Sequence, residues 1–180
     1  MTHTAVPETV HYTIQTSPIG QLLIAAINQE IVRVAFHNQD FDTVITGLQT
    51  QFGGPVHRDD NALQFATDQF EEYFAGTRYS FQLPTRQISP DRFNSQVQQR
   101  LTTIPYGQTR SYGEFATELA RPGAARAVGS ACARNPMPLI QPCHRVVRAD
   151  GTIGDFSGTP AAKKYLLAFE RGENPDAPTS

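Results

Sequence analysis

The chain has 180 residues, of which 39% are hydrophobic and 18% are charged, and its formal net charge at pH 7 is −2. This balance is typical of a folded globular protein. It excludes a disordered chain and a protein that binds polyanions through a uniformly basic surface. No apolar run is long enough to span a membrane, and the N-terminus lacks the pattern of a signal peptide. Because the chain has only 2 cysteines, we expect no disulfide framework, a reducing environment and a cytoplasmic location.

The first third of the chain predicts strands. The runs V-H-Y-T-I-Q, Q-L-L-I-A-A-I and I-V-R-V-A-F are separated by the turns S-P-I-G and N-Q-E, which predicts an antiparallel meander. A helix follows, with one apolar face formed by Phe41, Val44, Ile45 and Leu48. A second helix is expected over about 61–75, ending at Gly76. His37 and His57 have no cysteine nearby and no ligand spacing, so we expect no metal site and a supporting role for this half.

The stretch L-P-T-R-Q-I-S-P marks a linker between two domains. We predict an N-terminal domain at 1–85, a linker at 86–92, a C-terminal domain at 93–172 and a disordered tail at 173–180. After the linker, Ser89 and Pro90 are expected to begin a helix, as its N-cap and its first residue. The buried stripe of this helix is predicted to consist of Phe93, Val97, Leu101 and Ile104.

Two short helices are then predicted around a tight turn. Ser111 and Glu114 have the spacing of a capping box, which opens a helix to about Ala120. R-P-G breaks the chain, and A-A-R-A-V-G-S-A-C-A-R at 124–134 predicts a second helix of small residues. This is the outline of a helix-turn-helix. Taken alone, such a helical hairpin is more often structural than DNA-binding.

Charge is unevenly distributed along the chain. Residues 1–90 carry four Arg and nine Asp or Glu, a net charge of −5, whereas residues 92–148 carry eight Arg and two Glu, a net charge of +6. Because the planar guanidinium of arginine suits phosphates, the second half is a candidate nucleic-acid surface. Charges that merely solvate separate helices would give the same pattern, so composition leaves both interpretations open.

The stretch I-Q-P-C-H-R-V-V places a cysteine between a proline and a histidine. A thiol is a good nucleophile only as its thiolate, so a reactive Cys143 needs a base. In a strand, Cys143 and His144 would point to opposite faces, but a water could connect them. A small buried cysteine without reactivity is the alternative, and the stretch alone does not decide between the two.

Glu170 is a candidate for the group that orients His144. A final helix is predicted from Thr159, as N-cap, to about Glu170, with Gly172 ending it. Glu170 therefore lies in the last turn, where the helix dipole disfavours a carboxylate and a compensating partner would be favourable. An exposed glutamate partly balanced by Arg171 would explain the residue equally well.

Together these motifs resemble the O6-alkylguanine-DNA alkyltransferase family. P-C-H-R-V-V is preceded by N-P-M-P and A-A-R-A-V-G and followed by G-D-F-S-G, and the similarity includes I-P-Y-G-Q-T-R-S-Y-G-E, from about Phe93 to Glu170. The resemblance implies an α+β protein. An N-terminal α/β domain with a small antiparallel sheet, ribonuclease H-like, would be joined to a mainly helical C-terminal domain with a winged-helix-like helix-turn-helix.

The resemblance also implies a function, direct-reversal DNA repair. The chain would flip a damaged base out of duplex DNA and transfer the alkyl group of O6-alkylguanine to Cys143, irreversibly and once per molecule, with O4-alkylthymine as a further candidate. In this interpretation His144 would deprotonate the thiol through a water and Glu170 would orient His144. Asn135 would brace the turn that carries the cysteine, and Tyr112 would donate a hydrogen bond to the guanine as it leaves.

Contacts with DNA are implied by the same resemblance. Arg126 would fill the hole that the flipped base leaves, while Ala125 and Gly129 are small enough to let their helix lie close in the minor groove. The Ser157 backbone and the carbonyl groups of Cys143 and Val146 would read the flipped base. The expected partner is duplex DNA with an alkylated guanine, with no cofactor, no metal and no membrane. The chain is expected to be a monomer in solution, and cooperative binding on DNA is left open.

The sequence departs from the usual family pattern at three positions. Gln98 stands where tryptophan is frequent, Gln141 where an aliphatic residue is usual, and Phe156 lacks a hydroxyl that some relatives have. Cys132 is expected to be a packing residue. Two other functions stay open: a protein that binds alkylated bases without transferring the group and, less favoured, a cysteine hydrolase, for which the sequence shows no separate oxyanion hole.

Overall fold

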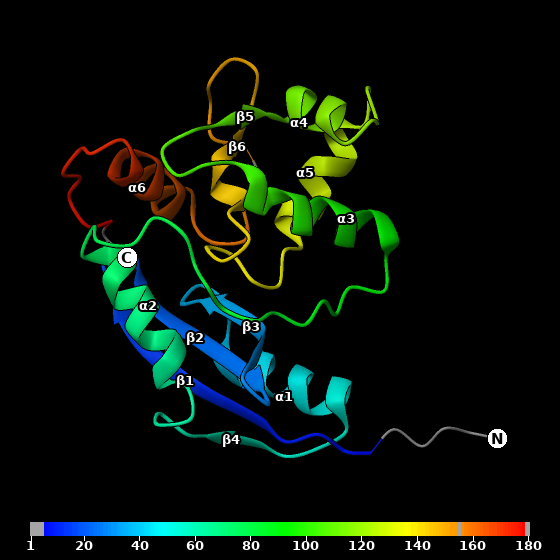
Figure 1. The fold of residues 1–180 in the computed structure, drawn as a ribbon, viewed down its shortest axis with the longest axis vertical. Helices are drawn as coiled ribbons and strands as arrows, with labels where there is room; N and C mark the ends of the chain where they lie inside the picture. Colours follow the sequence, from blue (N-terminus) through cyan, green and yellow to red (C-terminus); the bar gives the residue numbers. More distant parts are fainter. Residues whose placement is uncertain (1–5, 155, 179–180) are drawn as a thin grey trace. The chain divides into compact units, whose positions relative to one another are not determined.

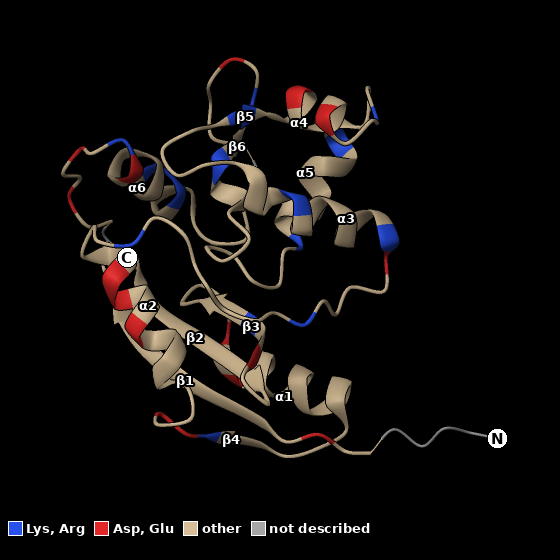
Figure 2. Ribbon diagram, viewed as in Figure 1, with Lys and Arg blue, Asp and Glu red and all other residues tan. Residues whose placement is uncertain are grey.

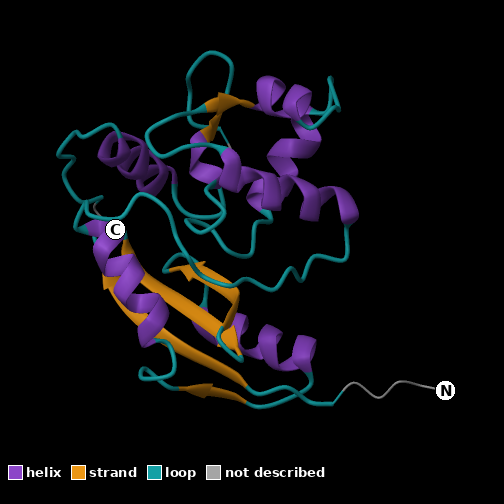
Figure 3. Cartoon of the chain, in the orientation of Figure 1, coloured by secondary structure: helices purple, strands orange, loops and turns teal. Residues whose placement is uncertain are grey.

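The computed structural model in Figure 1 describes residues 6–154 and 156–178. The chain forms two compact units: the first runs up to Arg78 and adds Gln82–Arg86, and the second contains Tyr79–Phe81 and the chain from Gln87 onward. Strands dominate the first unit and helices the second (Figure 3), so the predicted α+β class is confirmed. Among the described residues, no helix has both the length and the apolar character needed to cross a membrane. Residues 179–180 of the predicted tail lie outside the described residues.

A mixed sheet forms the centre of the first unit. In the described part of the chain its strands are β1 (Val10–Ser17), β2 (Gly20–Ile27), β3 (Glu30–Phe36) and β4 (Val56–Arg58), in the order β3-β2-β1-β4. β1, β2 and β3 form the predicted antiparallel meander. The expectation of a purely antiparallel sheet is wrong, because β4 pairs with β1 in parallel. With only three residues, β4 is too short to show the alternation that reveals a strand.

Two helices cover opposite faces of this sheet. They are α1 (Phe41–Phe52) and α2 (Gln64–Phe74). On β1, Val10 packs in an apolar cluster with Leu48 of α1. Gln15 points to the other face, since it is an odd number of residues away, and its Nε2 donates to the Thr67 carbonyl of α2 at 3.1 Å. β2 lies between the two layers and is buried from Leu22 to Ile27.

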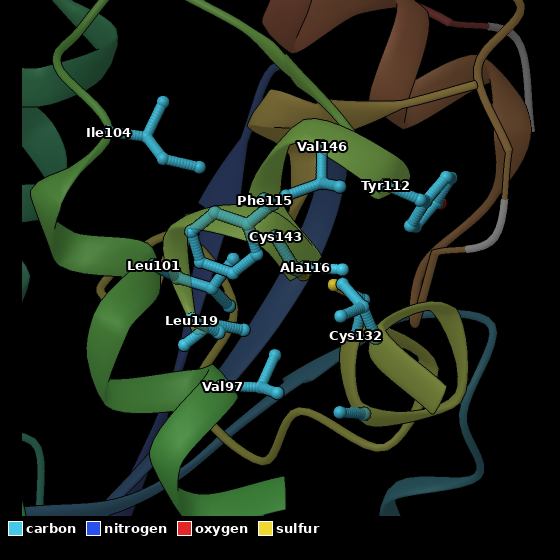
Figure 4. Packing of buried hydrophobic residues seen from close by; sticks show 12 residues of the cluster. Val97, Leu101, Ile104, Tyr112, Phe115, Ala116, Leu119, Cys132, Cys143 and Val146 are labelled. Carbon is cyan, nitrogen blue, oxygen red and sulfur yellow. The ribbon is translucent and has the colours of Figure 1, made fainter. Parts of the chain in front are cut away.

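The second unit is mainly helical. Its elements are α3 (Arg92–Arg100), the 3-10 turn η1 (Leu101–Thr103), β5 (Arg110–Ser111), α4 (Tyr112–Glu118), α5 (Ala125–Ala133), the 3-10 turn η2 (Cys143–Arg145), β6 (Val146–Val147) and α6 (Pro160–Glu170). β5 and β6 pair in parallel. Of the predicted stripe, Val97, Leu101 and Ile104 are buried in a core shared with Phe115 (Figure 4), whereas Phe93 is partly buried and packs against this core. Cys132 belongs to the same core, as expected of a packing residue.

α3 begins later than the sequence predicts. Asp91, and not Ser89, is the N-cap, because its carboxylate accepts a hydrogen bond from the Asn94 backbone N–H at 2.9 Å. Pro90 therefore precedes the helix, and the Ser89 carbonyl accepts from the Ser95 hydroxyl at 3.1 Å. Serine and aspartate are both favoured N-caps, but the carboxylate is also attracted by the positive end of the helix dipole.

α4 and α5 form the two helices of the predicted helical hairpin. The capping box is confirmed: Ser111 Oγ accepts from the Glu114 backbone N–H at 3.1 Å, and a Glu114 carboxylate oxygen accepts from the Ser111 N–H at 2.7 Å. α4 ends at Glu118. The connection to α5 includes Gly123, whose φ of +87° lies in the left-handed region that glycine adopts without strain.

Candidate active site

Cys143 lies on a single 3-10 turn. The expectation that a strand carries it is wrong, because Cys143–Arg145 form η2 and β6 begins only at Val146. The Cys143 N–H donates to the Gln141 carbonyl at 2.8 Å, and the Val146 N–H donates to the Cys143 carbonyl. Successive side chains on such a turn are rotated by roughly 120°, so Cys143 and His144 do not point to opposite faces as they would in a strand.

Asn135 holds the chain that leads into this turn. Its Nδ2 donates to the Gln141 carbonyl at 2.7 Å, and its Oδ1 accepts from the Met137 N–H at 3.0 Å. Asn135 is buried, and its own N–H donates to the Cys132 carbonyl in α5 at 3.2 Å. The side chain therefore connects the end of α5 to the residues just before Cys143.

The Cys143 thiol is buried. Burial raises its pKa, and this effect exceeds the opposing effects of the Asn135 side chain and of the positive charge on Lys163. The resting thiol is therefore protonated at neutral pH. Since only the thiolate is a strong nucleophile, the site needs a base to be reactive.

His144, Arg145 and Glu170 form a buried ionic cluster. His144 Nε2 lies 2.8 Å from Glu170 Oε1, and Arg145 donates to both carboxylate oxygens at 2.9 Å. Arg145 also donates to the Ile104 carbonyl at 2.7 Å. The Gly107 N–H donates to Glu170 Oε2 at 3.2 Å. The carboxylate is thus compensated by two cationic or donor side chains and a backbone N–H, and not by Arg171, which pairs with Glu173.

The protonation states in this cluster follow from its charges. Burial alone would raise the pKa of Glu170, but His144 and Arg145 together outweigh burial and hold this pKa well below its usual range. Burial lowers the pKa of His144, despite the attraction of Glu170. Because burial holds this pKa below its ordinary value of about 6.5, His144 is uncharged at neutral pH. Its Nε2 carries the proton toward the carboxylate, so Nδ1 is left as a proton acceptor.

The free nitrogen of His144 is itself buried. His144 Nδ1 has no hydrogen-bond partner within the described residues. The residue next to the thiol therefore presents an unprotonated ring nitrogen, while its other nitrogen is held by Glu170. An unprotonated ring nitrogen of this kind is a proton acceptor.

Two charged residues of this site were not predicted. Arg145 was expected among the arginines that could face phosphates, whereas its side chain is only 8% exposed. No role was predicted for Lys163, although this residue is fully buried and its Nζ donates to the Val146 carbonyl at 2.6 Å. The signal for Lys163 is its place on α6, on the same helical face as Leu166 and Glu170.

Aromatic rings flank Lys163. Its Nζ lies 5.8 Å from the ring centroid of Tyr112 and 5.9 Å from that of Phe156, within the range of cation–π attraction. Tyr112 is also packed against Gly154, where an added Cβ would lie 2.5 Å from the Tyr112 hydroxyl oxygen. Nearby in sequence, the Ser157 side chain interacts with the Cys143 thiol and lowers its pKa, although burial outweighs this effect.

The predicted DNA-contact residues on α5 differ in their exposure. Arg126 is exposed, Ala125 is half-buried and Gly129 is buried. Figure 2 shows basic residues on α3, β5 and α5. Like Arg145, Arg110 forms an ion pair: its Nε lies 2.8 Å from Glu118 Oε1. The exposed arginines of this region are Arg92, Arg100, Arg121, Arg126, Arg134 and Arg148. The described residues contain no group of three or more His, Cys, Asp or Glu arranged to hold a metal ion.

Known proteins resemble the chain over nearly its whole length. Residues 10–87 match the model of the 6-O-methylguanine DNA methyltransferase ribonuclease-like domain, and residues 92–172 match that of the DNA binding domain. The constitutive methylated-DNA–protein-cysteine methyltransferase of Bacillus subtilis is 37% identical over 163 residues, which cover 89% of this chain and 95% of that protein.

Solved structures give the same result. The crystal structure of the Mycobacterium tuberculosis O6-methylguanine methyltransferase is 37% identical and superposes with a TM-score of 0.80, over 92% of this chain and 95% of that one. A crystal structure of the Mycobacterium tuberculosis protein in complex with DNA superposes with a TM-score of 0.76 at 36% identity and the same coverage. The chain therefore belongs to the 6-O-methylguanine DNA methyltransferase family.

Proposed function

We propose that the chain repairs DNA by moving the alkyl group of O6-alkylguanine to its own Cys143. The chain binds DNA and transfers alkyl groups from O6-methylguanine to a cysteine, as its family does. The observation that carries the choice of cysteine is the histidine next to Cys143. Cys143 and Cys132 are both buried in one apolar cluster, but only Cys143 is followed by a histidine, His144, which has one nitrogen free and the other fixed by Glu170.

The reaction that we propose is a direct displacement. The thiol proton of Cys143 passes through a water to His144 Nδ1, and the sulfur attacks the alkyl carbon. The bond between this carbon and guanine O6 breaks, its electron pair stays on the guanine, and the base takes a proton from a donor that we assign to Tyr112. The imidazolium returns its proton through solvent to restore Tyr112. Since the carbon–sulfur bond of the thioether product is stable and no step of the reaction breaks it, the thiol is not regenerated and each molecule acts once.

Access to the lesion requires base flipping. The reactive carbon is enclosed in the duplex, and extruding the base costs a few kcal/mol, less when the base is damaged and poorly paired. Phosphate contacts from the exposed arginines can offset this cost without reading sequence. We propose that Arg126 fills the gap that the flipped base leaves in the duplex. The small residues Ala125 and Gly129 would let α5 lie close to the DNA.

We assign recognition of the flipped base to groups around the thiol. They are the Ser157 backbone and the carbonyl groups of Cys143 and Val146. The Val146 carbonyl already accepts from Lys163, but a carbonyl oxygen has a second lone pair. O4-alkylthymine is a further candidate substrate. We expect the chain to act on duplex DNA as a monomer, in a reducing compartment such as the cytoplasm, because the reaction consumes a free thiol.

A mass measurement tests the proposal. The protein is incubated with a duplex that contains O6-methylguanine, and intact and peptide masses are measured. One methyl group on the peptide with Cys143, together with loss of the lesion, is the expected result. Tight binding without a mass change would favour a protein that only recognises alkylated bases, and a methyl group on Cys132 would overturn the assignment. Repeated turnover of an ester would favour a cysteine hydrolase.

Arg126→Ala is expected to slow transfer from duplex DNA by about tenfold, which corresponds to roughly 1.4 kcal/mol. Transfer from the free base O6-benzylguanine should be unchanged, because the exposed Arg126 would act only on the duplex. Single-turnover rates with the two substrates measure both effects. Arg58→Ala is a matched control, since Arg58 lies in the first unit and pairs with Asp60 at 3.0 Å. An unchanged duplex rate in Arg126→Ala would show that the assignment is wrong.

A further inference from the structure

Three glutamine side chains connect α5 to the turn that carries Cys143. Gln98 Nε2 donates to the Ala131 carbonyl in α5 at 3.3 Å, and Gln98 Oε1 accepts from Gln87 Nε2 at 2.7 Å. Gln87 Oε1 in turn accepts from Gln141 Nε2 at 3.2 Å. We call Gln87, Gln98 and Gln141 the glutamine network. All three residues belong to the second unit.

The glutamine network is buried, at positions where apolar side chains would need no hydrogen-bond partners. Gln98 is 1% exposed and Gln141 is 2% exposed. Burial of each amide therefore lowers the stability of the protein unless the polar atoms of the amide are hydrogen-bonded. The hydrogen bonding of the network is incomplete, because Gln141 Oε1 has no partner among the described residues. A partly satisfied buried network is a poor way to gain stability. Its presence in the buried interior therefore calls for another explanation.

The two ends of the glutamine network bond to α5, which we propose contacts DNA, and to the turn that carries Cys143. Ala131 lies in the last turn of α5, where carbonyl groups have no N–H partner within the helix, and Gln98 satisfies this one. At the other end, the Gln141 backbone carbonyl accepts from both Asn135 and Cys143. Gln141 thus belongs to the chain that shapes the turn, and its side chain ties this chain to Gln87.

The glutamine network adds a second connection to the one that Asn135 provides. Asn135 follows Arg134, the C-cap residue of α5, and contacts the chain before Cys143, which fixes one point of the turn. The turn is also bonded to Glu170 of α6 through His144 and Arg145, but Asn135 is a single connection between the turn and α5. Gln98 attaches to α5 at Ala131 and reaches Gln141 through Gln87, from α3 and the segment that precedes it. Two attachments at different points fix the orientation of the turn as well as its position.

We propose that the glutamine network is a positioning device that keeps the Cys143 turn aligned with α5 while α5 is bound to DNA. The inference rests on the proposed function, in which α5 contacts the duplex and Cys143 accepts the alkyl group. None of the three side chains touches the reacting atoms. Their effect is to place the sulfur on the line of attack when the flipped base arrives from the duplex, and small misplacements of this kind slow reactions strongly.

The test uses Gln98→Met and Gln141→Leu, which keep similar volume and remove the hydrogen bonds. Single-turnover transfer is measured at saturating protein, from an O6-methylguanine duplex and from free O6-benzylguanine. We expect the duplex rate to fall about tenfold, with duplex affinity and the free-base rate unchanged, because the free base does not load α5. The melting temperature of Gln141→Leu should be equal or higher, since an unsatisfied buried carbonyl is removed.

Two further variants sharpen the result. Gln99→Met makes the same change on the exposed side of α3 and should leave both rates unchanged. Gln87→Ala, at a half-buried position, removes the middle of the network without opening the core. Combined with Gln141→Leu, it should slow transfer no more than either change alone, because both break the same connection. If Gln98→Met fails to fold, the Gln87 and Gln141 variants still decide the question.

The possible outcomes separate this inference from the proposed function. An unchanged duplex rate in folded variants would overturn the positioning role. Equal slowing with the duplex and the free base would show that the network acts on the turn alone and not through α5, which also overturns the proposal. If the unaltered protein forms no adduct on Cys143, the proposed function itself is wrong.

Discussion

Cys143→Ser is expected to abolish alkyl transfer while DNA binding stays unchanged. A serine hydroxyl is far less acidic than a thiol, and the neutral His144 cannot convert it into an alkoxide at neutral pH. The substitution is small and the site is buried, so we expect the fold and the exposed surface of α5 to persist. Transfer is measured by peptide mass after incubation with an O6-methylguanine duplex, and binding by electrophoretic mobility of the same duplex.

Cys132→Ala provides the matched control for this experiment. Cys132 is the other buried cysteine, and it packs in the core without a base beside it in the sequence. Its replacement should reduce stability slightly, through a small cavity, and leave one methyl group per molecule on Cys143. A full adduct in Cys143→Ser would refute the central assignment, and an adduct that disappears only in Cys132→Ala would transfer the role to that residue.

Glu170→Gln is expected to reduce both stability and transfer. The change removes the counter-charge of the buried Arg145, and an unpaired buried charge costs about 3–5 kcal/mol. For a unit of this size the melting temperature should fall by roughly 10 °C or more. The amide also holds the His144 imidazole less firmly, so transfer should slow on the order of 100-fold. Thermal unfolding and single-turnover rates measure the two effects.

A double variant separates these two effects. In Glu170→Gln combined with Arg145→Leu, both members of the charged pair are gone, so much of the lost stability should return. Recovery should be partial, because the Ile104 carbonyl loses its partner. The transfer rate should stay low, since His144 still lacks its carboxylate. If rate and stability recover together, Glu170 contributes through folding alone and does not orient His144.

The pH dependence of stability has a sign fixed by this cluster. Folding lowers the pKa of both His144 and Glu170. The stability that these two groups contribute is therefore fully present at a pH above their pKa values in the unfolded chain. It is lost as the pH falls, first below about 6.5 for His144 and then below about 4.3 for Glu170. In Glu170→Gln the second loss should disappear. Because the base stays neutral, the transfer rate of the unaltered protein should not decline until the pH is below 6.5.

Local patterns were sufficient to predict much of the fold. The meander of β1 to β3 and the capping box at Ser111 are encoded within a few residues, by alternation and by side chain-to-backbone bonds. Thr159 and Pro160 begin α6, as predicted, for the same reason. β4 was missed because three residues show no period, and η2 was taken for a strand because V-V follows it directly.

Buried charges were the part of the site that local patterns could not supply. Arg145 and Lys163 read as surface residues in the sequence, because charged side chains are rarely buried without partners. Their partners are distant along the chain: Glu170 is 25 residues from Arg145, and Val146 is 17 residues from Lys163. The family resemblance pointed to Cys143, His144 and Glu170. Only the fold shows which charges surround them.

The burial of Cys143 has a consequence for the lifetime of the unused protein. A group that reacts once is wasted by any unintended reaction, and the cell contains oxidants and small electrophiles that attack exposed thiolates. Cys143 has 0% relative exposure, and burial raises its pKa, so it meets these reagents neither as an accessible atom nor as an anion. In the proposed function, the enclosure that makes the thiol dependent on a base would also preserve it until a damaged base arrives.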